Sequence, residues 1–492
     1  MLDVERTQVI VVGAGAAGIN AAIASARHGA ETFLIENHGF LGGLSSTLPW
    51  LGFHDQDFRM VVKGQALEIV KKLQQANAAS EFVLDPKCGS AVSIDGHYWK
   101  CLAMEMVREA GVRPLLETRV ADTLRNGDRV AGVVVEHKSG RQAILADVVI
   151  DCSGDGDVAA RGGAVWEKGR ASDGLVQAPT LVFRLGGVDR DEFVAGCKDP
   201  ANNYREWLAP YPELWEKMMN RIDSMPVIIC GGFAGLIEQA RKAGEFHVPQ
   251  SRIVGCKLHQ DDQYLVVMTR MLGLDPVDTI SLNDAYAHIY QQIPELVRFF
   301  HKWIPGFEQS YLLEIAPMLG VRESRRIMGD YVLTGDDLVA GRQFDDVVAL
   351  GGYHIDIHRP SGTWVESKNV KTYDIPYRCL VARDVDNLMM AGKCASTTHE
   401  ALASTRIVPV CMAQGQAAGT AAALAVRDGV SPRDVSIDEL QGTLIDQGAE
   451  LRQTLGQPDA ELIRTIGKLP LEEPTTSGEQ DAASQDSNAW IT

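Results

Sequence analysis

The hydrophobic pattern at the start of the chain predicts a strand, a loop, a helix and a second strand. Val9–Val12 is an uninterrupted run of β-branched residues, as expected for a strand buried on both faces. A glycine-rich loop comes next, followed by an alanine-rich helix to about His28 and a second apolar run at Thr32–Ile35, which ends in Glu36. Strands and helices that alternate in this way indicate an α/β domain built on a parallel sheet.

The loop Gly13-Ala14-Gly15-Ala16-Ala17-Gly18 has the glycine spacing of a dinucleotide-binding turn. Gly13 permits the tight turn, Gly15 lets the backbone approach a pyrophosphate, and Gly18 lets the helix pack against the strand. The N–H groups at the helix N-terminus favour phosphate, and Glu36 is placed to accept a hydrogen bond from a ribose hydroxyl. A tight turn without a ligand is the alternative, and by itself the motif fits NAD and FAD equally.

The pattern changes twice farther along the chain. Helical periodicity at Val61–Asn77 and Tyr98–Ala110 gives way to strands over Val112–Ile150: RPLLETRV, a hairpin at Asn126-Gly127 and a meander. The regular alternation is lost in the middle of the chain. There we predict helices at Tyr204–Met219 and Leu282–Trp303 and strands at Pro179–Leu185 and Tyr264–Met268. A short strand from Asn387 and an apolar helical stretch at Ala401–Val426 then return to the first domain.

These elements predict an α/β fold in which a Rossmann-like domain with a β-meander is interrupted by a mixed α+β substrate domain. We place the first segment of the Rossmann-like domain at residues 1–164, the substrate or cap domain at 165–372, the second segment of the Rossmann-like domain at 373–430, a helical segment at 431–470 and an acidic tail, expected to be disordered, at 471–492.

Composition argues against several functions. The formal net charge is −18, from 47 basic and 65 acidic residues, without a basic stripe, so we expect no nucleic-acid partner. Arg406, Gln414 and Gln416 interrupt the stretch Ala401–Val426, which favours a buried helix over a membrane span. Nine cysteines without a CxxC spacing, and no room for a signal peptide before the first strand, indicate a reducing, cytoplasmic location.

Three later stretches favour FAD over NAD. The doublet Gly42-Gly43 keeps side chains away from a cofactor that continues beyond the pyrophosphate, which a nicotinamide enzyme does not require. The run SGDGD, Ser153 to Asp157, ends a strand where backbone can contact a bound cofactor, and the segment GK…GQAAG, Gly392 to Gly419, closes the domain. We therefore predict FAD.

Together these stretches resemble the FAD-dependent oxidoreductases of the glutathione-reductase-like flavoprotein superfamily, in the branch related to the flavin subunit of heterodisulfide reductase. The motifs that carry the resemblance are GAGAAG with Glu36, Gly42-Gly43, SGDGD, VRESRRIMGDY, GGYHIDIH and GKCASTTHEALASTRIVPVCMAQGQAAG. The cysteine-rich insert of heterodisulfide reductases is absent here, so electron transfer between clusters is not expected.

The resemblance implies an FAD site from five regions of the chain. Gly13, Gly15, Ala16, Ala17 and Gly18 would hold the pyrophosphate, Glu36 the ribose, and Asn37, Gly42, Gly43 and Leu44 the path toward the flavin. Val120 would contact adenine, Ser153, Gly154 and Asp155 would flank the cofactor, Gly392 and Lys393 would lie by the ribityl chain, and Gln414, Gly415, Gln416, Ala417 and Ala418 would face the pyrimidine end of the flavin from a helix N-terminus.

Histidines supply the candidates for proton transfer. His399 follows the strand of Gly392 and is the first choice, and His358 is the second, because imidazole titrates near neutrality. His354, Asp356 and His358 alternate, so a strand would place them on one face. Three ligands without a fourth do not favour a metal site, and a substrate-binding pair or a hydrogen-bonded strand are the alternatives.

Arginines supply the candidates for substrate orientation. Arg322, Arg325 and Arg326 lie close together, and one of them could clamp a carboxylate or a flavin oxygen, with an ion-pair network as the alternative. Arg406 lies in an apolar run, where an unpaired charge is costly, so it requires an acid, the cofactor or an anionic substrate.

We therefore expect an enzyme that transfers a hydride between a small organic substrate and flavin N5, with Arg406 or Arg322 orienting the substrate. A reductase of activated C=C bonds resembling fumarate reductases is one alternative, and a non-catalytic, redox-sensing flavoprotein of an assembly is another. The sequence leaves three electron acceptors open: oxygen, a quinone and a partner protein. It also leaves open whether the chain forms a homo-oligomer. No membrane partner is expected.

Overall fold

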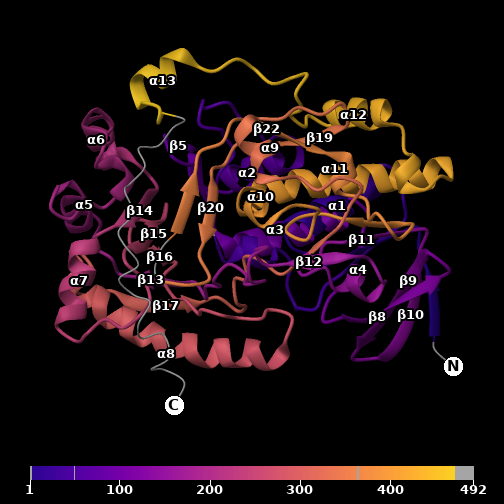
Figure 1. Ribbon diagram of the computed structural model, residues 1–492, viewed down its shortest axis with the longest axis horizontal. Coiled ribbons are helices and arrows are strands. Elements are labelled where there is room, and N and C mark those ends of the chain that lie inside the picture. Colours follow the sequence, from indigo (N-terminus) through magenta and orange to yellow (C-terminus); the bar gives the residue numbers. More distant parts are fainter. Residues whose placement is uncertain (1–2, 49, 363–364, 471–492) are drawn as a thin grey trace.

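The computed structural model describes residues 3–48, 50–362 and 365–470, and the predicted tail at 471–492 lies outside these ranges. Its centre is a five-stranded sheet, in the order β23-β11-β2-β3-β7, in which every neighbouring pair is parallel. The strands are β2 (Val9–Val12), β3 (Thr32–Ile35), β7 (Arg113–Leu115), β11 (Val148–Asp151) and β23 (Leu388–Met390). The predicted α/β fold with a Rossmann-like sheet is confirmed (Figure 1).

Two helices from opposite ends of the chain pack closely beside this sheet. They are α1 (Ala16–Arg27) and α11 (Val408–Asp428). A Cβ atom at Gly415 or Gly419 would lie 2.0 Å from the carbonyl oxygen of Ala17 or Ala21, so only glycine allows this approach. Helices α2 (Gly64–Gln75) and α3 (Gly96–Glu109) complete this region of the core.

The β-meander forms a separate four-stranded sheet in the order β1-β10-β9-β8. Its strands are β1 (Asp3–Arg6), β8 (Arg119–Asn126), β9 (Arg129–His137) and β10 (Gly140–Leu145). The single strand predicted over RPLLETRV is wrong: the first half is β7 of the central sheet and the second half is β8 of the meander. Glu117, with φ of 48°, turns the chain between the two sheets.

The middle of the chain builds an antiparallel five-stranded sheet, in the order β14-β15-β16-β13-β17, with its own core. The strands are β13 (Phe183–Gly186), β14 (Ile228–Gly232), β15 (Ile253–Lys257), β16 (Tyr264–Val266) and β17 (Tyr311–Ile315), and the helices are α5 (Arg190–Lys198), α6 (Pro212–Met219), α7 (Ala234–Lys242) and α8 (Thr279–Trp303). The helix predicted from Tyr204 starts later, at Pro212. Figure 1 shows this sheet and its helices at one end of the molecule and the meander at the other. The boundaries at 164 and 372 stay predictions.

Short strands between the two large regions carry much of the candidate chemistry. They form the pairs β12 (Trp166–Lys168) with β18 (Arg325–Ile327), β19 (Val347–Gly351) with β22 (Tyr373–Pro376) and β20 (Ile355–His358) with β21 (Val365–Lys368), and the set β4 (Trp50–Leu51), β6 (Gly89–Ser93) and β5 (Val83–Asp85). The remaining helices are α4 (Asp157–Arg161), α9 (Gly335–Ala340), α12 (Ile437–Asp446) and α13 (Ala460–Ile466).

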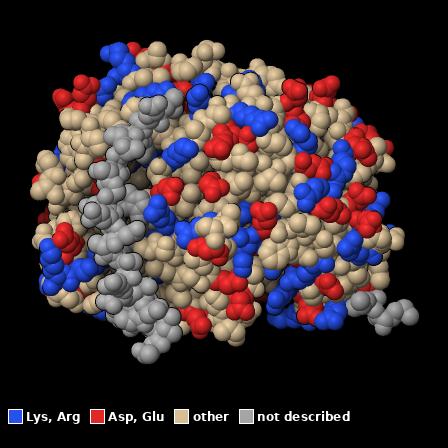
Figure 2. Space-filling model, viewed as in Figure 1, with Lys and Arg blue, Asp and Glu red and all other residues tan. Residues whose placement is uncertain are grey.

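The stretch predicted as one buried helix over Ala401–Val426 is two helices, α10 (His399–Thr405) and α11, which meet at 93°. Within the described ranges, no single helix is long and apolar enough to cross a membrane, and this bent pair meets the criterion by length and composition only. On the face in Figure 2, acidic and basic side chains are interspersed.

Candidate active site

The glycine loop between β2 and α1 forms a cradle of bare backbone. Gly13 has φ of +93°, and a Cβ atom at Gly18 would lie 1.7 Å from the carbonyl oxygen of Gly13. Both positions therefore require glycine, one for the turn and one for the contact between helix and loop. At Gly15, by contrast, a Cβ atom would meet nothing within 4 Å, so the backbone here is open to a ligand.

The N-terminus of α1 and Glu36 complete the cradle. Gly15 caps α1 without a side-chain hydrogen bond, so the N–H groups at Ala16 and Ala17 are left for an anion. Glu36, at the end of β3, is buried and accepts hydrogen bonds from the backbone N–H of Ala14 at 2.7 Å and of His38 at 2.8 Å. Its carboxylate is held where a ribose would follow a pyrophosphate, and this geometry fits the adenosine half of FAD.

A second group of residues lies where β11 and β23 end. Asp151 accepts hydrogen bonds from the backbone and side chain of Ser153, which shapes the turn into Gly154 and its φ of +82°. Lys393 donates from Nζ to Asp155 at 2.6 Å. Burial opposes ionisation of Asp155, but the lysine ammonium outweighs it and lowers the pKa of the carboxyl below its ordinary value.

Other predicted cofactor residues are distributed as follows. Asn37 is exposed just beyond β3, the glycine doublet Gly42-Gly43 lies beside Gly15, and Val120 is buried in β8. The backbone N–H of Gly392 donates to Oε1 of Gln414 at 3.0 Å. Gln414 therefore binds the end of β23 and supports the loop that carries Lys393.

The predicted helix N-terminus at Gln414–Ala418 is wrong, because α11 begins at Val408. The side chain of Gln416 binds the backbone N–H of Gln65 and the side chain of Gln447, and Ala417 and Ala418 are fully buried. These residues pack α11 against its neighbours. The end of the helix that can face a ligand is at Ile407 and Val408, and Pro409 was the available signal, since proline is favoured in the first helical turn.

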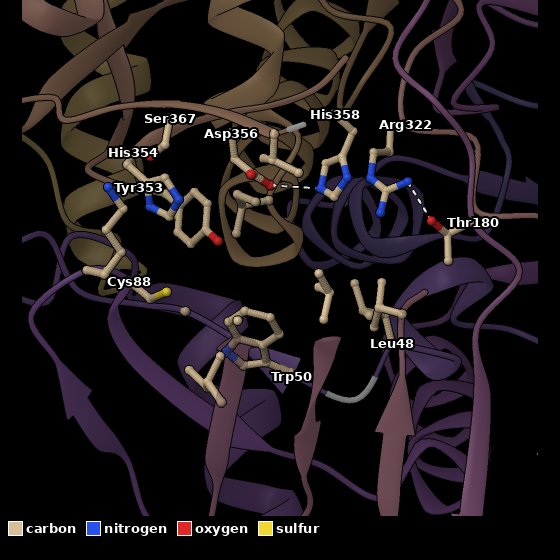
Figure 3. A pocket seen from close by; sticks show the side chains of 18 of the residues that line it. Leu48, Trp50, Cys88, Thr180, Arg322, Tyr353, His354, Asp356, His358 and Ser367 are labelled. Atoms are coloured by element: carbon tan, nitrogen blue, oxygen red, sulfur yellow. Dashed lines mark hydrogen bonds and ion pairs between the residues drawn. The ribbon is translucent and has the colours of Figure 1, made fainter. Parts of the chain in front are cut away.

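A cavity of about 850 Å³ separates the two large regions. On one side it is lined by Leu44 and Lys393, which were predicted to lie along the cofactor, and by Arg406, Ile407 and Val408 at the N-terminus of α11. On the other side lie Ile229 and Val254 of the antiparallel sheet, and Val182 just before β13. The aromatic side chains of Trp50, Trp207, Tyr211 and Tyr353 contribute to the wall. Figure 3 shows the region of this cavity that carries Trp50, Tyr353 and the charged side chains.

One wall of the cavity brings His358, Asp356, Arg406 and Arg322 together. Nε2 of His358 lies 3.3 Å from Oδ2 of Asp356, and Nη2 of Arg406 lies 3.0 Å from the Asp356 carbonyl oxygen and 3.4 Å from Oδ2. Three of the four predicted catalytic residues therefore lie in one cluster. The alternation that predicted a shared face for Asp356 and His358 holds within β20.

Burial and charge set the protonation of this cluster. Desolvation, followed by the positive charge of Arg322, lowers the pKa of His358 to about 3, so its imidazole is neutral at pH 7. Burial opposes the ionisation of Asp356, but His358 and Arg406 hold its pKa well below the ordinary value. The wall therefore presents a neutral imidazole beside a carboxylate and two guanidinium groups.

His354 lies apart from this cluster. Its ring stacks on Tyr353 at 4.2 Å between centroids, and Figure 3 shows it on the other side of Asp356 from His358. Desolvation lowers the pKa of His354 to about 3. Within the described ranges, no group of three His, Cys, Asp or Glu side chains is arranged to hold a metal ion.

His399, the first choice for proton transfer, does not line the cavity. It is buried, and Nδ1 lies 2.7 Å from Oε2 of Glu323. The other oxygen of Glu323 pairs with Arg326, which also donates to the carbonyl oxygens of Thr397 and Gly169. Arg325 pairs with Asp157 at 2.9 Å. The ion-pair network is therefore the correct interpretation for Arg325 and Arg326, whereas Arg322 lies in the cavity wall.

Comparison with known proteins adds a family. The family described as FAD dependent oxidoreductase matches residues 8–444. The thiamine thiazole synthase of Aeropyrum pernix is 33% identical over 130 residues, which cover 26% of this chain and 44% of that protein, so less than half of its length is matched.

Solved structures with similarity over most of the chain have low sequence identity. The p-nitrophenol 4-monooxygenase PnpA from Pseudomonas putida DLL-E4 is 11% identical, with a TM-score of 0.46 over 90% of this chain and 84% of that one. The myxobacterial chondrochloren halogenase CndH is 13% identical, with a TM-score of 0.46 over 95% and 87%. Because the family match spans most of the chain and includes the whole glycine cradle, this protein belongs to the FAD dependent oxidoreductase family and is an enzyme with FAD as its cofactor.

Proposed function

We propose that this enzyme transfers a hydride between a small organic substrate in the cavity and FAD, and that His358 accepts or returns the accompanying proton. The observation that supports this most directly is the shared cavity: Leu44 and Lys393, expected along the cofactor toward the flavin, line the same space as His358. When bound, FAD supplies the two-electron chemistry at N5.

The cradle residues would hold the cofactor in the following way. The loop from Gly13 to Gly18 and the N-terminus of α1 would bind the pyrophosphate, and Glu36 would bind the ribose. Asn37, the Gly42–Leu44 backbone and Val120 would contact the rest of the adenosine side and the path toward the flavin. Lys393, fixed by Asp155, would lie by the ribityl chain, and the backbone at Val408 would face the flavin with the positive end of α11.

His358 is neutral in its present environment, so one of its ring nitrogens can accept a proton. As an ionised acceptor, Asp356 favours a proton on Nε2 of His358, which leaves Nδ1 as the nitrogen that accepts a proton. Arg406 pairs with Asp356 and holds that carboxylate in place. His399 acts through Glu323 and Arg326 on the loop at Thr397, so we assign it a positioning role.

Several finer statements are also proposals. The domain boundaries and the place in the branch related to the heterodisulfide reductase flavin subunit rest on the sequence motifs. We propose a cytoplasmic location, which is supported by nine free cysteines, eight of them buried. Oxygen, a quinone or a partner protein would take the electrons.

Anaerobic reduction of the purified holoenzyme tests the proposal. Bleaching of the flavin absorbance by a panel of small alcohols, amines and organic acids is expected, and His358→Gln should slow it about 10²- to 10⁴-fold with FAD retained. His97→Gln, at a side chain that is 60% exposed, is the matched control and should leave the rate unchanged. Unchanged reduction in His358→Gln would refute the role of His358, and a holoenzyme without FAD would refute the cofactor assignment. Reoxidation of the reduced enzyme by an activated alkene would favour the C=C reductase instead.

A further inference from the structure

We propose that the substrate carries a carboxylate group and that the guanidinium of Arg322 binds it inside the cavity. This inference rests on the proposed function and deepens it, because it names the chemical class of the substrate. It starts from a guanidinium in the cavity wall that has only neutral partners.

Arg322 is half-buried, and its Nη1 donates to the carbonyl oxygen of Ala178 at 2.6 Å and to Oγ1 of Thr180 at 2.7 Å. Figure 3 shows this side chain at the edge of the cavity beside His358. Across the described region of the chain, no carboxylate forms an ion pair with Arg322, and its Nε and Nη2 make no hydrogen bond. The guanidinium group is therefore held in place through Nη1, and its Nε and Nη2 are left to bind a carboxylate.

Three buried arginines in this chain each have an acid as a partner. Arg205 lies 2.9 Å from Asp85, Arg326 pairs with Glu323, and Arg184 pairs with Glu314. This is the expected arrangement, because a buried charge is costly unless a partner compensates it. Arg322 differs from these three arginines, because its hydrogen-bond partners are a backbone carbonyl and a hydroxyl group.

The charges around Arg322 make the missing partner more costly. Burial, and then the positive charge of Arg406, lower the pKa of Arg322 to about 9; Asp356 opposes this shift, and Arg270 adds a smaller lowering effect. The nearest carboxylate, Asp356, already pairs with His358 and Arg406. A ligand carboxylate at Arg322 would supply the negative charge that this wall lacks.

The rest of the cavity suits the body of an organic acid better than a bare inorganic anion. The volume of about 850 Å³ is far larger than such an ion requires, and Trp50, Trp207 and Tyr353 offer apolar surface. A carboxylate at Arg322 would also place the adjoining carbon atoms beside His358, which is the group proposed to handle the proton.

Binding of carboxylates to the holoenzyme tests this inference. The probes are acetate, succinate, 3-phenylpropanoate and indole-3-acetate, each compared with its primary amide, together with inorganic phosphate. Affinity is measured by calorimetry and by changes in the visible flavin spectrum. At least one carboxylate should bind about tenfold or more tightly than its amide, and Arg322→Gln should weaken it by about 10- to 100-fold.

Two variants control for other effects. Arg359→Gln removes a cavity cation that already pairs with Glu366, at 3.2 Å, and should leave the affinity within about twofold. Arg322→Lys keeps the positive charge but loses the planar guanidinium group. It should therefore bind the carboxylate more tightly than Arg322→Gln but more weakly than the parent protein.

The remaining outcomes overturn the inference. These are equal binding of acid and amide, unchanged binding by Arg322→Gln, binding of phosphate alone, and no binding by any probe. Loss of FAD in Arg322→Gln would assign the guanidinium to the cofactor instead. Failure of the proposed function gives different results: the purified protein has no flavin spectrum, or His358→Gln is reduced at an unchanged rate. The two failures can therefore be distinguished.

Discussion

The glycine cradle and the cavity wall are built in opposite ways. In the cradle, glycines at positions 13, 15 and 18 remove side chains so that backbone can turn, pack and face a ligand. In the wall, three charged side chains and one neutral imidazole from separate segments converge, namely Arg322, Asp356, Arg406 and His358. The cradle therefore depends on steric fit between backbone segments, and the wall depends on charge compensation between side chains.

This difference explains why the two regions respond to different perturbations. A methyl group at Gly13 or Gly18 meets backbone that cannot move aside, whatever the pH. The wall tolerates changes of shape more easily, because it borders a cavity, but it is sensitive to proton concentration and to ligand charge. Three predictions test the contrast, in addition to the His358 and Arg322 experiments.

Gly18→Ala should have the largest effect. Its methyl group would lie 1.7 Å from the carbonyl oxygen of Gly13, so the loop and α1 must separate. We expect a loss of about 3 kcal/mol or more in the free energy of unfolding, measured by urea denaturation, together with loss of bound FAD. Gly235→Ala in α7, where the added methyl meets nothing within 4 Å, is the control and should be neutral or slightly stabilising. A stable, yellow Gly18→Ala protein would show that the cradle is not limited by steric fit.

Acidification should produce the next largest effect, at His354. Its pKa is about 3 in the folded protein and about 6.5 when unfolded, so the unfolded state binds the proton first as the pH falls. The stability that the folded protein gains from keeping His354 neutral is complete above pH 6.5 and is lost progressively toward pH 3. Between pH 7 and pH 4.5 the loss is about 3 kcal/mol, from two pH units at about 1.4 kcal/mol each.

His354→Gln removes that titration. The difference in the free energy of unfolding between pH 7 and pH 4.5 should therefore shrink by about 3 kcal/mol in the variant. His97→Gln, at an exposed histidine, should keep the pH dependence of the parent. Identical pH dependence in parent and His354→Gln would mean that His354 is protonated in the folded protein, and the electrostatic description of this side of the cavity would fail.

Gly15→Ala should have the smallest effect and is the most specific test of the cradle. The backbone at Gly15, with φ of −80°, is allowed for alanine, and the methyl would point into open space. The free energy of unfolding without added FAD should change by no more than about 1 kcal/mol. The affinity for FAD should fall by about tenfold, or about 1.4 kcal/mol, because the methyl occupies the approach to the pyrophosphate. Unchanged affinity would place the pyrophosphate elsewhere.

The sequence predicted the central sheet and the cradle because local patterns encode them. Val9–Val12, the glycine spacing and the Asn126-Gly127 hairpin each describe structure within a few residues. The split of RPLLETRV into two sheets was missed, since both halves favour strands and only the positive φ at Glu117 separates them.

The candidate site was only partly predictable. The alternation in β20 correctly joined Asp356 to His358, because a strand period of two is local. Nothing local indicates that Glu323 would bury His399, which is 76 positions away, or that Arg322 would have no acid. Such pairings are decided by how distant segments pack, and a single sequence does not display that packing.

The contact between α1 and α11 also sets an order of events during synthesis. The cradle at the start of the chain rests on glycines near its end, since Gly415 and Gly419 lie against Ala17 and Ala21. During synthesis the phosphate loop therefore emerges long before α11, the helix that supports it. The face of α1 that contacts α11 stays uncovered throughout that interval, so the cradle is completed only after α11 has been made.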